Sequence, residues 1–236
     1  MKKSKFVLLC IGIEVMLILC IALANMNPTT IPYFTFYNLG YGLFFSILVP
    51  LYFLRKENES FSSVGIKKLG VRQFAVLIVF AAFSCGQLIP LITAGEQIPW
   101  NLLPMGIVPL IMTTFFEEFL FRGFIQTRME KNFGWFVAII ASGLLFSFYH
   151  LGYPGYRNFS SLLLLFAVGA EFAIAYKLSG NNLLVSYFVN LPNSFITYMV
   201  RNHQFPTMRL SSSISAAITL VLIIVTLYSF QKRKSK

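Results

Sequence analysis

Eight apolar runs, each long enough to cross a lipid bilayer, constrain the fold of this chain more than any other feature. A transmembrane helix needs about 20 predominantly apolar residues. Hydrophobic residues make up 57% of the chain and charged residues only 11%, whereas a soluble domain carries about 25% charged residues. We therefore predict an all-α, polytopic membrane helical bundle that forms a single domain over residues 1–236. The runs lie at residues 6–24, 33–54, 74–94, 102–129, 133–150, 159–176, 183–200 and 214–230.

The basic residues predict how the bundle sits in the membrane. The formal net charge is +11, but Lys and Arg stand at the ends of apolar runs and not along one polar face, so we expect no nucleic-acid partner. If both termini are cytoplasmic, fifteen basic residues lie on that side, against Arg157, Arg201 and Arg209 on the other. This bias follows the rule that cytoplasmic loops are enriched in Lys and Arg. It predicts an even number of spans in a membrane, and the Phe-, Ile- and Lys-rich composition favours a bacterial plasma membrane.

Two adjacent carboxylates lie inside the fourth apolar run. The chain has eight acidic residues, and Glu117 and Glu118 stand side by side there. An ionisable residue at the centre of a membrane helix costs roughly 2.5 to 3.5 kcal/mol on insertion scales, which makes such residues functional candidates. Glu118 and Arg122 are four residues apart and can pair on one helix face. Glu117 is then turned about 100° away, free to act as an acid or base. A purely structural pair that locks helix packing is the alternative.

Further polar groups fall in two other runs. His150 ends the fifth run, while the second histidine, His203, lies in a predicted outer loop. Asn190 and Asn193 flank Pro192 in the seventh run, where the proline can kink the helix and open a polar cavity. The alternative for His150 is a hydrogen-bonded core residue, and amides in membrane helices often bond across helices. These groups can meet the glutamates in one cavity within the membrane.

These residues resemble the motifs of a known family. Glu117-Glu118-Phe-Leu-Phe-Arg122 fits Glu-Glu-x-x-x-Arg, and Phe146-Ser-Phe-Tyr-His150 fits Phe-x-x-x-His. Both are similar to the CAAX prenyl protease and bacteriocin-processing family (CPBP or Abi) of intramembrane metalloproteases, with residues 100–200 as the catalytic core. In the third motif, Asn190 stands where the family has a second histidine. The family's asparagine falls on Ser194, unless Asn193 takes its role.

The resemblance implies an intramembrane endopeptidase. Glu117 or Glu118 would activate a water molecule, and His150 would position that water or a metal. A zinc ion would be held by Glu117 and His150, although catalytic zinc commonly takes three protein ligands, so a metal-free site stays open. Arg122 would hold the glutamate pair, and Asn190 or Asn193 would donate to the oxyanion.

The resemblance also implies the biological setting and its alternatives. The partners would be the lipid bilayer and a peptide or small membrane-associated protein substrate, in peptide pheromone or bacteriocin maturation or in bacteriocin self-immunity. The alternative is a non-catalytic membrane scaffold or immunity protein of the same fold, which the Asn190 departure favours. A third interpretation, a proton-coupled transporter using Glu14 and Glu171, is weakened because we see no repeat between the halves of the chain.

Overall fold

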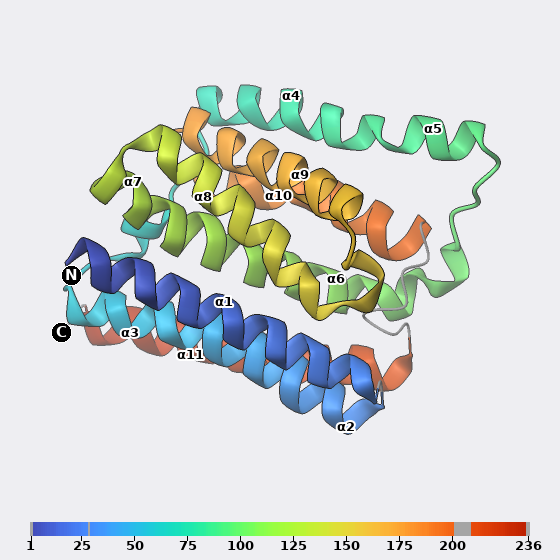
Figure 1. The fold of residues 1–236 in the computed structure, drawn as a ribbon, viewed down its shortest axis with the longest axis horizontal. Helices are drawn as coiled ribbons and strands as arrows, with labels where there is room; N and C mark the ends of the chain where they lie inside the picture. The colour runs from blue at the N-terminus through green and yellow to red at the C-terminus, as the bar shows by residue number, and fades with distance from the viewer. Residues whose placement is uncertain (1, 28, 201–208, 235–236) are drawn as a thin grey trace.

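The computed structural model describes residues 2–27, 29–200 and 209–234 and shows a helical bundle (Figure 1). Eight helices in this part of the chain are long and apolar enough to cross a membrane, and no strand occurs among the described residues. The predicted all-α bundle of eight spans is therefore confirmed. The spans are Lys3–Met26, Thr30–Lys56, Val71–Thr93, Trp100–Phe133, Trp135–Gly152, Phe159–Leu178, Leu183–Val200 and Leu210–Lys232.

The first two spans and the last pack together along one side of the bundle (Figure 1). They comprise α1 (Lys3–Met26), then α2 (Thr30–Pro32), the π-helix η1 (Tyr33–Leu48) and α3 (Val49–Lys56), and finally α11 (Leu210–Lys234). The η1 helix turns Tyr33, Tyr37 and Tyr41 inward, with exposures of 0 to 1%. Neighbouring rings in this row are 5.1 and 5.0 Å apart. This row of tyrosines packs against the centre of the bundle, where Tyr41 contacts Phe116 and Tyr149.

The fourth span is the central helix and carries the glutamate pair. It runs through η3 (Trp100–Leu102), α6 (Leu103–Glu117), the π-helix η4 (Glu118–Gln126) and α7 (Thr127–Phe133). All nine residues of η4 are buried, because η1, α8, α9 and α10 surround it. The span ends later than predicted: Gly134, with φ of 88°, breaks the helix, and the fifth span begins at Trp135 and not at Phe133. A positive φ of this size is readily adopted only by glycine.

Three further spans enclose η4 from the other side. The fifth comprises α8 (Trp135–Phe148) and η5 (Tyr149–Gly152), followed by η6 (Pro154–Tyr156), the sixth is α9 (Phe159–Leu178), and the seventh joins α10 (Leu183–Phe195) to the π-helix η7 (Ile196–Val200). At the α8–α9 contact, a Cβ on Gly169 would lie 2.8 Å from Cδ1 of Phe146. Glycine therefore lets these two helices approach closely, and it leaves the Gly169 carbonyl accessible to the centre.

The third span lies at the edge of the bundle, along the top of Figure 1. It consists of α4 (Val71–Gly86) and α5 (Leu88–Thr93), and the loop before it contains η2 (Phe61–Val64). Within α4, which is described in full, only Ser84 is buried. Val76, Leu77 and Phe80 are partly buried against the core, whereas most of the remaining side chains of α4 are exposed. A helix with one packed face and one exposed face is expected at the edge of a bundle.

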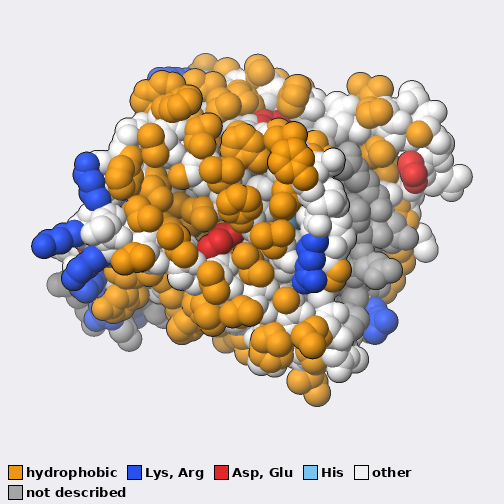
Figure 2. Space-filling view, viewed as in Figure 1, with side chains coloured by type: hydrophobic (Ala, Val, Ile, Leu, Met, Phe, Trp, Pro, Cys, Tyr) orange, Lys and Arg blue, Asp and Glu red, His pale blue; other side chains and the backbone are white. Residues whose placement is uncertain are grey.

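The surface fits a protein embedded in a bilayer. In Figure 2, hydrophobic side chains cover the middle of the molecule, and several Lys and Arg side chains gather at the end where Figure 1 places both termini. This is the arrangement expected of a multi-pass membrane protein. The cytoplasmic location of the termini stays a prediction. Arg201 and His203 lie outside the described residues.

Candidate functional site

The two glutamates are bridged by one amide. Glu117 is the last residue of α6 and Glu118 the first of η4, and their exposures are 3% and 0%. Asn190 Nδ2, from α10, donates to Glu117 Oε2 and to Glu118 Oε1, at 2.9 Å in each case. An amide nitrogen has two N–H groups, and Asn190 lies where it reaches both carboxylates. The role of Glu117 as an acid or base stays a prediction.

Two hydroxyl groups hold this amide in place. Ser194 Oγ donates to Asn190 Oδ1 at 3.1 Å, and Thr114 Oγ1 donates to Ser194 Oγ at 2.9 Å. Because the amide oxygen accepts from Ser194, the amide nitrogen is directed at the glutamates. Sequence reasoning did not select Thr114, and it noted Ser194 only as a departure. Asn193 makes no side-chain hydrogen bond within the described part of the chain and does not join this network.

A tyrosine that the sequence analysis did not select completes the surroundings of Glu117. Tyr149 Oη donates to Glu117 Oε1 at 2.5 Å. Its ring is fully buried and stacks at 5.9 Å on Tyr41 and at 5.2 Å on Phe121. Both oxygens of Glu117 therefore accept a hydrogen bond in the resting structure. The available signal was the position of this hydroxyl inside the Phe-x-x-x-His motif, directly before His150.

His150 contacts Tyr149, the residue that donates a hydrogen bond to Glu117. Its ring centroid lies 4.0 Å from that of Tyr149, and Nδ1 lies 2.8 Å from the Phe146 carbonyl oxygen. A carbonyl can only accept, so Nδ1 carries the hydrogen, and in the neutral ring Nε2 is left as an acceptor. The histidine is 6% exposed and also contacts Tyr153 and Tyr156, with ring centroids 5.6 and 5.2 Å away. It is thus oriented in an aromatic pocket beside the glutamates.

Arg122 compensates the negative charge of the pair. Its Nη1 lies 3.6 Å from Glu118 Oε1, so the predicted ion pair is present but long. Nη2 donates to the Gly169 carbonyl at 2.7 Å, and the guanidinium lies over the rings of Phe146 and Phe172 at 4.7 and 5.3 Å. Backbone and aromatic contacts therefore hold this fully buried cation together with Glu118.

The donor set does not match a zinc site. Among the described residues, no group of three or more His, Cys, Asp or Glu side chains is placed to hold a metal ion. Zinc in catalytic sites takes three protein ligands, usually His, Cys or carboxylate. Asn190 brings a neutral amide where the resemblance expects a histidine, and this amide is committed to the glutamates. We therefore derive no step through a metal, and zinc binding by Glu117 and His150 stays a prediction.

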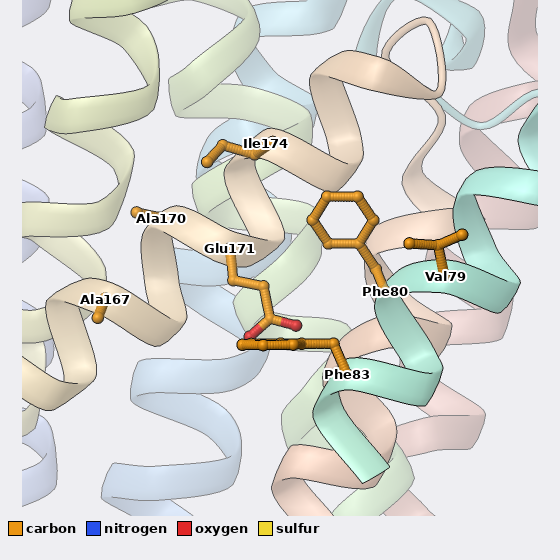
Figure 3. Close-up of a pocket in the computed structure, with 7 residues that line it drawn as sticks. All are labelled: Val79, Phe80, Phe83, Ala167, Ala170, Glu171 and Ile174. Atoms are coloured by element: carbon orange, nitrogen blue, oxygen red, sulfur yellow. The ribbon is translucent and has the colours of Figure 1, made fainter. Parts of the chain in front are cut away.

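The other carboxylates of the membrane region lie elsewhere. Glu171 points away from the site into a groove of about 380 Å³ between α9 and α4, where Ser84 Oγ donates to it at 2.9 Å (Figure 3). Glu14 is buried on α1, and neither of its carboxylate oxygens has a hydrogen-bond partner among the described residues. No hydrogen bond in this part of the chain connects either residue to Glu117.

Fold and site together define a multi-pass membrane protein with a buried, amide-bridged glutamate pair beside a histidine. Residues 99–196 match the family described as type II CAAX prenyl endopeptidase Rce1-like. The range includes Glu117, Arg122, His150 and Asn190, so the predicted resemblance to the CPBP family is confirmed over this segment. The family is one of intramembrane CAAX-type proteases. Comparisons with curated proteins and with solved structures find no match.

Proposed function

We propose that this protein is an intramembrane endopeptidase of a bacterial plasma membrane that cleaves a peptide or small membrane-associated protein with a water molecule activated by Glu117. The observation that carries the proposal is the hydrogen-bonding of Glu117, which accepts from Tyr149 and Asn190 in a fully enclosed site. A general base must be held in a fixed orientation within hydrogen-bond reach of the proton that it removes.

The residues suggest how the protons move. Glu117 takes a proton from water as the water oxygen attacks the peptide carbonyl, and it returns that proton to the leaving amine. Once Glu117 is protonated, its hydrogen bond from Asn190 weakens, which frees an N–H group for the developing oxyanion. One such donor is typically worth about 3 kcal/mol of transition-state stabilisation. His150 Nε2, left as an acceptor, would orient the attacking water.

Arg122 and Glu118 would form the electrostatic support of the base. Arg122 lies 3.6 Å from Glu118 and is fully buried, so its charge acts in a medium of low dielectric. It offsets the repulsion between the two carboxylates. Glu118 in turn fixes one N–H of Asn190 and thereby the whole amide. In this proposal both residues act through Glu117 and Asn190 and do not touch the reacting atoms.

The substrate would reach the site from the bilayer. The glutamates lie midway along a helix of 34 residues, within the membrane region. A peptide with an apolar segment fits this location. The motifs shared with the CAAX prenyl protease and bacteriocin-processing family support peptide pheromone or bacteriocin maturation, or bacteriocin self-immunity, as the setting.

The proposal is tested by comparing peptide termini in membranes that carry the wild-type protein, Glu117→Gln or His150→Ala at equal abundance. We expect new termini with the wild type and none with the two variants. A matched control is Glu171→Gln, which changes a membrane glutamate outside the site and should leave the termini as in the wild type. Identical termini in all samples would contradict the proposal.

The second candidate is a non-catalytic scaffold or immunity protein of the same fold. The observation that favours it is Asn190, which replaces an expected histidine and engages both carboxylates. On this candidate, Glu117→Gln would retain full immunity in cells and no peptide termini would depend on the protein.

Tyr149→Phe tests the contribution of the tyrosine hydroxyl to Glu117. Removing the hydroxyl deletes the 2.5 Å hydrogen bond and leaves the ring packing in place. A hydrogen bond to a charged group contributes about 1.5 to 3 kcal/mol, so we expect cleavage to slow by about tenfold or more. The rate is measured with a fluorogenic version of a cleaved peptide in proteoliposomes. An unchanged rate would show that Tyr149 only fills space.

A further inference from the structure

A groove separate from the glutamate pair opens between α3 and α11 and has a volume of about 720 Å³. This is within the range of about 300 to 1,000 Å³ that is usual for small-molecule sites. Near it, the ring of Phe61 from η2 packs on Phe230 at 4.9 Å, so the loop after α3 contacts α11 at this end. The groove is lined by Leu48, Leu51, Tyr52, Arg55, Asn58, Val225, Thr226, Ser229 and Phe230.

The lining changes in character along the membrane normal. Leu48, Leu51 and Val225 make one part apolar, whereas Arg55 and Ser229 make the part nearer the termini polar. Leu48 and Arg55 are seven residues apart, which is about 10 Å along a helix. A ligand that fits this gradient has an apolar chain and a polar, negatively charged head.

The charge at the polar end is positive and largely uncompensated. Arg55 is exposed, and it forms no ion pair with any residue that the structure describes. Lys56 adds a second cation at the rim, with Nζ 5.8 Å from the ring centroid of Tyr52. The acids that follow in the sequence are engaged elsewhere: Glu57 lies 2.9 Å and Glu59 2.7 Å from Nη2 of Arg128.

Glu59 is also held in its ionised form by other cations. Partial burial raises its pKa, but the hydrogen bond from Lys131 and the charges of Arg128 and Lys131 outweigh burial, so the pKa is below its usual value. Glu57 and Glu59 carry two negative charges and Arg128 and Lys131 carry two positive charges, so these four charges balance one another. The charge of Arg55 is left to attract an anion from outside the protein.

We propose that this groove binds one anionic phospholipid, with its phosphate at Arg55 and an acyl chain along Leu48, Leu51 and Val225. Asn58 and Ser229 supply hydrogen bonds to the headgroup. The groove lies at the basic end of the bundle, and this end is predicted to face the leaflet that is rich in anionic lipids. Basic pockets between membrane helices on that side are suited to phospholipid headgroups.

Binding is measured by native mass spectrometry of the full-length protein with phosphatidylglycerol and with phosphatidylcholine of identical acyl chains. We expect the wild type to prefer phosphatidylglycerol by about fivefold or more, as one basic residue near an anionic headgroup contributes about that factor. Arg55→Gln should lower the affinity for phosphatidylglycerol by about fivefold and remove the preference. Val225→Trp, a change at an exposed lining residue, should fill the groove and weaken the binding of both lipids.

Arg72→Gln is the matched control, because Arg72 is exposed at the same end of the molecule, on α4 and outside the groove. It should bind as the wild type does. The proposal would be overturned if Arg72→Gln lowered the affinity for phosphatidylglycerol as much as Arg55→Gln does. It would also be overturned if the wild type bound the two lipids equally. Inorganic phosphate at millimolar concentration should not displace phosphatidylglycerol, and displacement would show a phosphate site that does not use the apolar part of the groove.

Discussion

Glu117→Gln is expected to lower the rate of peptide cleavage by about a thousandfold. Glutamine keeps the size of the side chain and can still accept one hydrogen bond from Tyr149 or Asn190. It cannot take a proton from water, and a positioned general base contributes about 10² to 10⁴ in rate. The measurement is the initial rate of cleavage of a fluorogenic peptide by the purified protein in proteoliposomes. The rate is divided by the mass of protein in each sample.

The matched control for this substitution is Glu171→Gln. Glu171 is a half-buried glutamate with its own hydrogen bond from Ser84, on the face of α9 that lines the α4 groove. Its substitution makes the same chemical change outside the site, and we expect a rate within twofold of the wild type. A loss of equal size in both variants would mean that the rate reflects membrane insertion and not the chemistry of Glu117.

Arg122→Met is expected to destabilise the protein by about 3 to 5 kcal/mol, the usual cost of removing one member of a buried ion pair. The substitution leaves Glu118 without its cation and the Gly169 carbonyl without its donor. For a chain of this length, the loss corresponds to a fall of about 10 °C in the midpoint of thermal denaturation. The midpoint is measured in detergent by scanning fluorimetry.

Two further variants separate charge from geometry at this position. Arg122→Lys keeps the charge but lacks the planar group that lies over Phe146 and Phe172, so its midpoint should fall between those of the wild type and Arg122→Met. Arg72→Met removes an exposed arginine and should change the midpoint by less than about 2 °C. A midpoint for Arg122→Met equal to that of the wild type would refute a supporting role for the cation.

The fold could be predicted from the sequence because the membrane restricts the choices. A chain crossing hydrocarbon must satisfy its backbone polar groups internally, so an apolar run of about 20 residues is read as a helix. This argument found all eight spans. It could not place the boundary between the fourth and fifth spans. That boundary depends on the positive φ of Gly134, which the pattern of apolar residues does not predict.

The site was predicted only in part, for a geometric reason. The spacing of Glu118 and Arg122 lies within one helix, so their pairing follows from helical periodicity. The bridge from Asn190 and the hydrogen bond from Tyr149 join three helices and depend on how closely those helices approach. The spacing of residues along one segment does not report how closely separate helices approach.

Hydrolysis in water enriched with ¹⁸O tests the central claim, that Glu117 activates water for attack on a peptide bond. The full-length protein in proteoliposomes is incubated with a cleaved peptide, and the product is weighed by mass spectrometry. The account predicts one ¹⁸O atom in the new carboxyl terminus with the wild type and with Glu171→Gln, and almost no product with Glu117→Gln. Labelled product formed by Glu117→Gln at the wild-type rate would contradict it.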